Sequence, residues 1–366
     1  MPSNSAPSRE IRTLFESLVA DGKERGLQLT AYHNGKMVID VWAGTMSPAG
    51  EPVTGDTLFP LYSTGKGITA TIIHLLAHRG KLDYDDPIAR YWPAFAANGK
   101  AAITIRHALN HTAGLANLPS NIDRRQINDW NAMCRWLEQA APSTTPGTQV
   151  LYHAVTFGWI LGELAHRADG RSFNQIVDDE IRTPLHIDSL FFGIPDEVES
   201  LVAIAEEGPP APPAKDPPPP PAMTNIPASI IPLSEWMSQP DTRRACIPAS
   251  NGIMNTRALA RHYAALLPGG IDGVELLTPE RIKLATEATA LLPDSTLTPR
   301  PLGYSLGGAD PIMGPRPTAF GHHGFGGVTG FADPEAGFAY AFARNRFING
   351  ETPPLVANEV RRILGI

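Results

Sequence analysis

Hydrophobic and polar positions near the N-terminus follow first a helical period and then a strand period. Residues 9–25 place apolar side chains at the i, i+3, i+4 and i+7 positions of one helix face, and Gly26 is expected to end this helix. Residues 27–44 alternate apolar and polar positions around Asn34-Gly35, a dipeptide typical of two-residue hairpin turns. The N-terminal part therefore predicts a helix followed by two antiparallel strands.

The C-terminal part returns to the strand pattern. From Phe320 onward, short apolar stretches are separated by glycines and by Asp333-Pro334, and residues 354–365 predict a last amphipathic helix. The sequence between the two ends is mainly helical in its pattern. The helices expected there span residues 66–80, 104–110, 129–140, 155–169, 172–182 and 256–267.

Because strands come from both chain ends and helices fill the middle, we expect an α+β fold. The pattern indicates one antiparallel sheet built from the two chain ends, with a mainly helical domain inserted between them.

Composition narrows the function. The chain has 366 residues, a net charge of -7 and 42% hydrophobic residues, which suit a globular protein of about two structural units. The acidic balance argues against nucleic acid or a membrane surface as the partner. Cys134 and Cys246 lack the CxxC spacing of a zinc ribbon. Since no apolar run approaches a membrane span and the N-terminus has no signal-peptide core, we expect a cytoplasmic protein.

Proline is unusually frequent, with 36 residues in the chain. The richest stretch, residues 208–221, belongs to a region that we delimit as 208–223 and interpret as an exposed polyproline II loop of the helical domain. A docking segment for a partner with an aromatic groove is the alternative. Composition alone does not identify such a partner, so the loop is the preferred interpretation.

Ser63 and Lys66 form the first candidate catalytic pair. They are three residues apart where an apolar helix begins, so their side chains share one helix face within hydrogen-bond reach. A serine hydroxyl needs a base to become nucleophilic, and a lysine can be that base where burial favours its neutral amine. Free N–H groups at the helix start would face the resulting oxyanion. The alternative is a helix-capping serine beside a solvated lysine.

Ser305 is a competing nucleophile. Residues 303–307 (GYSLG) fit the G-x-S-x-G nucleophile elbow of α/β-hydrolases, in which a strand precedes the serine and a helix follows it directly. The glycine- and proline-rich sequence that follows Ser305 disfavours a helix. We therefore expect Ser305 in an edge strand of the sheet.

Two further segments carry candidate chemistry. Tyr152 precedes an apolar helix that starts near Val155, where its hydroxyl could reach a cleft and, as a phenolate favoured by a nearby ammonium group, act as a general base. Residues 321–327 (GHHGFGG) place two histidines among glycines, which let a ligand approach the backbone closely. The ordinary alternatives are a core tyrosine and a glycine turn with exposed histidines.

Histidine spacing raises the question of a metal site. His74 and His78, like His107 and His111, have the i, i+4 spacing of half a zinc site. Neither pair is part of an HExxH motif, and no carboxylate or cysteine cluster completes it. We therefore predict neither a metal nor a cofactor.

Taken in order, these segments resemble the serine β-lactamase and penicillin-binding-protein superfamily, whose motifs are S-x-x-K, Y-x-N or S-x-N, and K-T-G. Residues 63–66 (STGK) match the first motif fully, and residues 152–154 (YHA) match the second at its tyrosine. Residues 322–324 (HHG) match the third with histidine in place of lysine. The resemblance extends over residues 10–365 and is greatest to the family VIII carboxylesterases.

The resemblance implies an α/β/α sandwich, in which an antiparallel sheet from residues 27–60 and about 300–345 is covered by the terminal helices. We place this α/β domain at residues 1–64 and 296–366 and the mainly helical domain at residues 65–295, with the active site in the cleft between them.

The resemblance also implies a set of site residues. Its catalytic residues would be Ser63, Lys66 and Tyr152, and which of the last two is the general base stays open because coupled groups titrate together. The implied oxyanion hole consists of the backbone N–H groups of Ser63 and Phe325. The implied substrate-binding residues are His322, His323, Gly324 and His153.

Two departures from the family pattern affect the expected substrate. Ala154 and His322 replace the asparagine and the lysine that, in β-lactam-active members, contact the amide side chain and the carboxylate of the lactam. A neutral histidine attracts a carboxylate weakly, so we expect a small or medium neutral ester, cleaved through an acyl-Ser63 intermediate. The alternatives are an acyltransferase using the same intermediate, a β-lactamase or D,D-peptidase, and a non-catalytic interaction protein.

Overall fold

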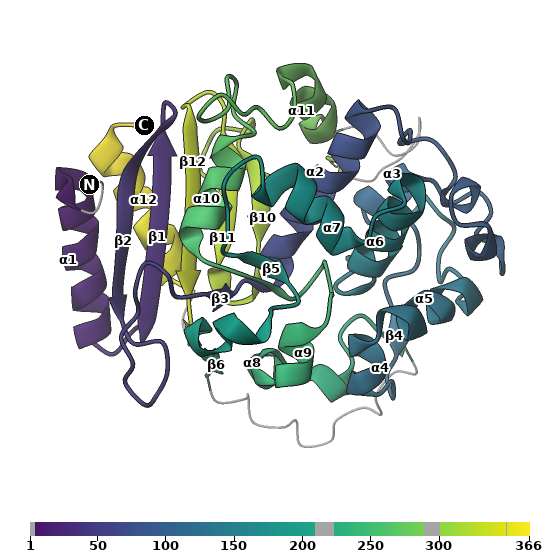
Figure 1. Cartoon of the computed structure of the whole chain (residues 1–366), viewed down its shortest axis with the longest axis horizontal. Coiled ribbons are helices and arrows are strands. Elements are labelled where there is room, and N and C mark those ends of the chain that lie inside the picture. The colour runs from purple at the N-terminus through teal and green to yellow at the C-terminus, as the bar shows by residue number, and fades with distance from the viewer. Residues whose placement is uncertain (1–3, 209–222, 289–300, 349) are drawn as a thin grey trace.

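A six-stranded antiparallel sheet, seen in the left half of Figure 1, joins the two ends of the chain. The computed structural model describes residues 4–208, 223–288, 301–348 and 350–366. The strand order is β2-β1-β12-β11-β10-β9, which confirms a sheet built from both termini. The strands are β1 (Gly26–His33), β2 (Lys36–Gly44), β9 (Ser305–Leu306), β10 (Phe320–His323), β11 (Thr329–Asp333) and β12 (Phe338–Arg344).

The hairpin between β1 and β2 has the predicted turn. Asn34 and Gly35 both have left-handed backbone angles, with φ of 50° and 71°, as a type I′ turn requires. β1 then pairs with β12 in a register that sets Leu29 opposite Phe342. Because β12 is buried along its whole length, this pairing lies in the centre of the fold.

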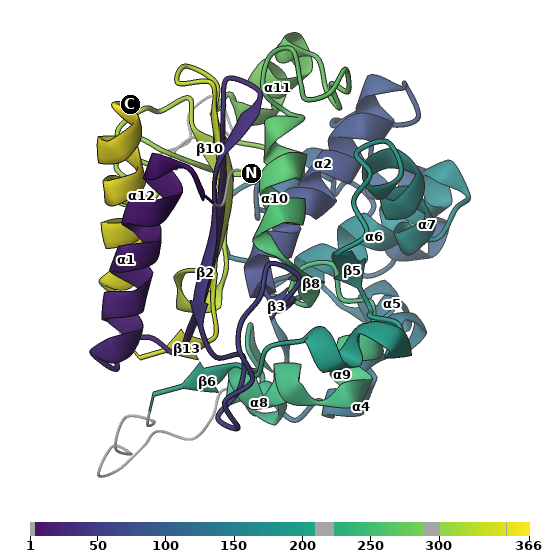
Figure 2. The ribbon, with the colours of Figure 1, turned by 60° about the vertical axis from the view of Figure 1, so that its left-hand side comes forward.

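Helices cover both faces of the sheet and give the α/β/α layers visible in Figure 2. α1 (Ala6–Ala20) and α12 (Thr352–Leu364) lie on one face, where Phe15 shares an apolar core with Phe342. α1 begins and ends earlier than the predicted range of 9–25, since Ser5 caps its first turn. α10 (Thr256–Ala264) packs on the other face against β1, β11 and β12.

The remaining helices form a second part around a larger apolar core. α2 runs through it with nearly all residues buried and packs against α6. Every helix predicted for the middle of the chain is present, although the one over residues 172–182 changes to a wider turn after Val177. The helices are α2 (Gly65–His78), α3 (Ile105–Leu109), α4 (Arg124–Asn128), α5 (Trp130–Gln139), α6 (Thr156–Asp169), α7 (Phe173–Val177), α8 (Leu233–Ser238), α9 (Pro240–Arg244) and α11 (Pro279–Thr286).

Short strands connect the layers outside the main sheet. β3 (Phe59–Pro60) pairs with β8 (Gly252–Met254), which also pairs with β5 (Leu190–Phe192). The expected sheet range of 27–60 is therefore too long, because its last residues belong to this separate sheet. Two further pairs are β4 (Leu118–Pro119) with β7 (Met223–Thr224) and β6 (Glu206–Glu207) with β13 (Arg346–Phe347).

Two expectations concern the chain as a whole. Residues 209–222 of the polyproline loop predicted over 208–223 lie outside the described residues. Among the helices that the structure describes, none combines the length and the apolar character needed to cross a bilayer.

Candidate active site

Ser63 lies at the N-terminal end of α2, in a short 3-10 turn formed by Tyr62–Thr64. Tyr62 has a φ of 49°, a left-handed conformation that a tyrosine rarely adopts. Such a conformation persists only where surrounding contacts hold it. The turn therefore presents Ser63 in a fixed position at the start of the helix.

Lys66 lies in the first turn of α2, and its side chain is completely buried. Its Nζ is 3.0 Å from Ser63 Oγ, 2.7 Å from Ala154 O and 2.8 Å from Ala249 O. Burial lowers the pKa of Lys66 well below its usual value. A neutral amine has two N–H groups and one lone pair, so the two carbonyls can accept its protons while the lone pair faces the Ser63 hydroxyl.

Tyr152 covers this amine, with its ring centre 4.9 Å from Lys66 Nζ. The residue keeps 40% of its surface exposed, yet its hydroxyl lies deep enough for burial to raise its pKa to about 12. A hydrogen bond with Ser63 acts in the opposite direction and is outweighed. The expected phenolate is therefore wrong, and Tyr152 is a protonated phenol at neutral pH.

The carbonyl of Ala249 belongs to residues 247–251, a segment that sequence reasoning did not assign to the site. Asn251 is completely buried and hydrogen-bonds three backbone groups of nearby residues, which holds the segment in place. Ser250 donates to Ala154 O at 3.4 Å. Both carbonyls that contact Lys66 are thus fixed by further hydrogen bonds or by burial, and neither is marked by a motif.

The end of β10 approaches the Ser63 turn closely because residue 324 is glycine. A Cβ atom on Gly324 would overlap the carbonyl oxygen of Leu61 and crowd the side chains of Val328 and Thr64. Phe325 follows directly and lines the same pocket as Ser63. The two residues whose N–H groups were expected to form the oxyanion hole therefore border one pocket.

Gly324→Ala is expected to push β10 away from the Ser63 turn and to lower ester turnover by about 10²-fold, because displacements of about 1 Å have effects of this size. The measurement is kcat/KM with p-nitrophenyl butyrate, together with the melting temperature. Gly350→Ala is the matched control, since a Cβ atom there meets open space. Equal turnover in the two variants would show that the close approach of β10 is not needed.

His323 also lines the pocket, and hydrogen bonds hold both sides of its ring. Nε2 lies 2.6 Å from Asp310 Oδ2, and Nδ1 lies 2.9 Å from Thr329 Oγ1. Burial acts to raise the pKa of Asp310, but His323 and two backbone N–H groups outweigh it and keep the pKa below its usual value. Sequence reasoning missed Asp310, which lies in the loop between β9 and β10.

His322 and His153, two of the four residues expected to bind substrate, are not among the described residues that line the pocket. The ring of His322 is nearly buried, and burial lowers its pKa to about 3. His153 is completely buried, with its ring nitrogens 3.2 Å from Leu115 N and 2.6 Å from Leu151 O. His153 is therefore a core residue, whereas His323 and Gly324 border the pocket.

A pocket of about 240 Å³ opens beside Ser63, and its walls are mostly apolar. One wall comes from residues 226–236, which carry no motif and were not expected at the site. The pocket is lined by Tyr62, Ser63, Tyr152, Ala154, Val155, Ile226, Ile230, Leu233, Trp236, Ser250, His323, Gly324 and Phe325. This lining can accommodate an uncharged acyl or alcohol group next to the serine hydroxyl.

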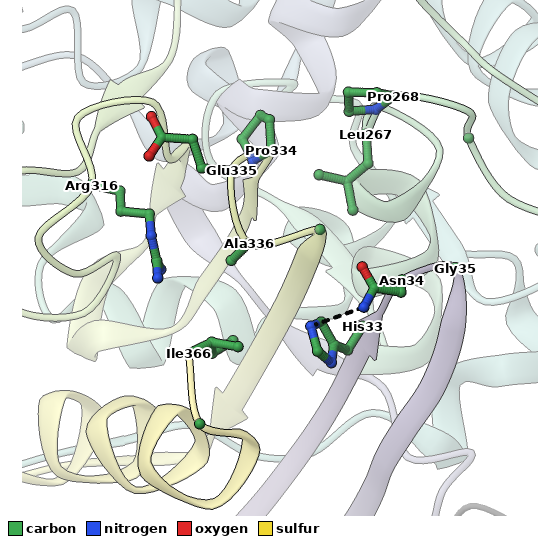
Figure 3. A pocket seen from close by; sticks show the side chains of 13 residues that line it. His33, Asn34, Gly35, Leu267, Pro268, Arg316, Pro334, Glu335, Ala336 and Ile366 are labelled. Atoms are coloured by element: carbon green, nitrogen blue, oxygen red, sulfur yellow. Dashed lines mark hydrogen bonds between the residues drawn. The ribbon is translucent and has the colours of Figure 1, made fainter.

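A larger cavity, of about 570 Å³, lies at the opposite end of the sheet (Figure 3). It is formed by the hairpin turn at Asn34-Gly35, the Arg316 and Glu335 side chains and the C-terminal Ile366. Neither Ser63 nor any other expected catalytic residue borders it. The size of a cavity alone therefore does not identify the candidate active site. The side chains that line the smaller pocket do.

Ser305 and His74 lie where a structural role explains them. Ser305 lies in the edge strand β9 opposite Gly321, and no helix follows it directly, so the edge-strand prediction is confirmed and the nucleophile elbow is wrong. His74 contacts Tyr84 Oη at 2.7 Å and Leu302 O at 2.9 Å in the core. Within the described ranges, no group of three or more potential metal ligands is present.

Comparisons with known proteins bear on the family and the fold of the chain. The family model described as Beta-lactamase matches residues 11–363. The Esterase/beta-lactamase LipL of Mycobacterium tuberculosis (strain ATCC 25618 / H37Rv) is 35% identical over 368 residues, covering 96% of this chain and 83% of that protein. A penicillin-binding protein homologue from Caulobacter crescentus superimposes with a TM-score of 0.84 at 32% identity, covering 98% and 97% of the two chains. A family VIII carboxylesterase superimposes with a TM-score of 0.83 at 29% identity, covering 98% of both.

The α/β/α scaffold and a serine beside a buried lysine define a serine hydrolase. The match spans nearly the whole chain and includes all three expected motif regions. The chain belongs to the beta-lactamase family.

Proposed function

We propose that the protein is a carboxylesterase that cleaves a small or medium ester through an acyl-Ser63 intermediate. The observation that carries this proposal is the 3.0 Å distance between Ser63 Oγ and the Nζ of a completely buried lysine. The names of the Esterase/beta-lactamase LipL and of the family VIII carboxylesterase both include an esterase, which supports the same reaction class. Catalysis is assigned to Ser63, Lys66 and Tyr152.

Lys66 is the general base in this scheme. Its neutral amine takes the Ser63 proton as Oγ forms a bond to the ester carbonyl carbon and the carbonyl π electrons move to oxygen. When the tetrahedral intermediate collapses, the alcohol leaves with the proton of the Tyr152 hydroxyl, and the Lys66 ammonium returns a proton to Tyr152. Water then attacks the acyl-serine by the same route in reverse, which releases the acid and restores Ser63.

The backbone N–H groups of Ser63 and Phe325 form the proposed oxyanion hole. Both residues line the pocket, and Ser63 stands at a helix start, where N–H groups have no partner within the helix. Each such donor typically contributes about 2.7–4 kcal/mol to lowering the barrier. His323 and Gly324 border the same region and contact the bound substrate in this scheme.

The substrate is proposed to be a neutral small-molecule ester. The side chains that line the pocket from residues 226–236 are apolar, and no lysine or arginine is among the described lining residues. The carboxylate of a β-lactam or of a peptide would therefore lose its hydration in the pocket without gaining a cationic partner. An uncharged ester has no charged group to desolvate, so this cost does not arise.

The proposal is tested by adding a fluorophosphonate probe and, separately, p-nitrophenyl butyrate to the intact protein. We expect one probe adduct, mapped to Ser63 by mass spectrometry, and release of p-nitrophenol and butyrate. Absence of both labelling and turnover would favour a non-catalytic interaction protein. Faster hydrolysis of nitrocefin than of any ester in a panel would favour a β-lactamase, and turnover of D-alanyl peptides would favour a peptidase.

Acyl transfer is the second candidate function. The apolar wall formed by Ile226, Ile230, Leu233 and Trp236 offers water no hydrogen-bond partners and can bind the apolar chain of an alcohol, which favours an alcohol as the acceptor. The same assay decides between the two when alcohols are supplied and the ratio of new ester to free acid is measured. A ratio that rises well above the molar ratio of alcohol to water identifies a transferase.

A further inference from the structure

Three aromatic rings connect the two sides of the pocket. Tyr62, Phe325 and Phe347 contact one another pairwise, with ring centres 5.5 to 5.6 Å apart and edge-to-face geometry in all three pairs. Tyr62 directly precedes Ser63, and Phe325 follows Gly324 at the end of β10. Phe347 is the member that belongs to neither segment, since it lies in β13 after the central strand β12.

Arg344 fixes the same loop through its backbone. Its Nε donates to the carbonyl oxygen of Gly326 at 2.6 Å. Its Nη1 donates to Glu24 Oε1, also at 2.6 Å, and both side chains are almost completely buried. The guanidinium thus links the centre of the sheet to the residue that follows Phe325.

The loop needs such contacts because of its glycines. Gly326 and Gly327 have φ values of 77° and 83°, which only glycine adopts easily, so the backbone here has little conformational restriction of its own. A Cβ atom on Gly326 would overlap the Phe347 ring, which shows how closely that ring packs on the loop. Arg344 and Phe347 therefore supply restrictions that the loop sequence lacks.

The segment that carries Phe347 is itself anchored. β13 pairs with β6, where Phe347 lies opposite Glu207, and Glu207 Oε1 accepts the N–H of Ser234 at 2.7 Å. Ser234 is in the first turn of α8, next to the pocket residue Leu233. The pairing of β13 with β6 thus holds the backbone of Phe347 in place, and with it the ring contacts.

We propose that Arg344 and Phe347 are positioning residues that set the distance between the Ser63 and Phe325 N–H groups. This inference rests on the proposed acyl-serine mechanism. Neither residue touches the reacting atoms. Phe347 holds the rings of Tyr62 and Phe325 against each other, and Arg344 holds the Gly326 carbonyl, so both donors stay aimed at one point while negative charge develops on the substrate oxygen. Their effect is therefore on the chemical step, with little effect on substrate binding.

Phe347→Leu and Arg344→Lys test the inference in the full-length protein. We expect the rate of acylation by p-nitrophenyl butyrate, measured in a stopped-flow burst, to fall at least tenfold in each variant, with KM within twofold of the wild type. Affinity for a phenylboronic acid, which mimics the tetrahedral intermediate, should fall by a similar factor. Phe347→Tyr, which keeps the ring, should recover most of the rate.

Phe338→Leu is the matched control, because Phe338 belongs to a separate three-ring cluster with Phe331 and Tyr340 at the far end of the sheet. This control should lose stability without losing its acylation rate or its affinity for the boronic acid. If Phe347→Leu is folded and acylates as fast as the wild type, the positioning role is refuted. If the wild type itself is neither acylated nor labelled at Ser63, the proposed function has failed instead.

Discussion

The Ser63→Ala variant is expected to lose about 10⁴- to 10⁶-fold in ester turnover, the range seen when the nucleophile of an acyl-enzyme mechanism is removed. The remaining Lys66 and Tyr152 have no oxygen on which to build the acyl intermediate. The fold should persist, since the substitution removes a single hydroxyl from a half-buried turn. The measurement is kcat/KM with p-nitrophenyl butyrate, combined with intact-mass detection of the acyl-enzyme.

Ser305→Ala provides the matched control for this substitution. Both variants remove one serine hydroxyl, but Ser305 lies in the edge strand β9 and not beside Lys66. Ser305→Ala should keep nearly full turnover. If Ser305→Ala collapses while Ser63→Ala stays active, the nucleophile has been misassigned and the whole mechanism fails with it.

The Lys66→Arg variant is expected to lose about 10²- to 10⁴-fold in turnover, the usual contribution of a positioned general base. Arginine keeps a positive charge and several donors, but it does not release its proton in proteins. A lysine that acts only through charge would therefore be replaced well, whereas a lysine that accepts the Ser63 proton would not. Lys66→Met removes both the charge and the basic nitrogen, and it should lose as much turnover as Lys66→Arg.

The pH dependence of the wild type gives a second readout of the same base. Only the neutral amine accepts a proton, so turnover should fall as the pH drops through the lowered pKa of Lys66 and level off above it. The pKa of Tyr152, at about 12, leaves its phenol proton available over this range. Lys100→Met is the matched control and should keep the pH profile of the wild type. Lys100 is also buried, but it donates to carbonyls such as Ala97 O, away from the pocket. A wild-type rate that rises below neutral pH would contradict the assignment.

The contact between Ser63 and Lys66 could be predicted because its geometry is local. Ser63 and Lys66 lie three residues apart at a helix start, and helix geometry alone brings such side chains together. The carbonyls of Ala154 and Ala249 could not be predicted in the same way. They reach Lys66 only through tertiary packing, and a backbone carbonyl leaves no mark in the side-chain pattern.

Side-chain direction and burial explain the other differences between the predictions from the sequence and the structure. His153 is next to Tyr152 in the chain, but the backbone turns its ring into the core, where both ring nitrogens have partners. The charge state of Tyr152 depends on how deeply its hydroxyl lies, which residue order does not show. The helices that were predicted, in contrast, follow local periodicity and differ from the structure by a few residues at their ends. The short helices α4, α8, α9 and α11 were not predicted.

The antiparallel pairing of β1 with β12 has a consequence for biosynthesis. Ser63 is translated well before the glycine-rich turn at Phe325 and the strands that support it. Until these later residues have emerged and β12 has paired with β1, a nascent chain carries the proposed nucleophile without the second half of the proposed oxyanion hole. Ester hydrolysis should therefore begin only once this part of the sheet has formed.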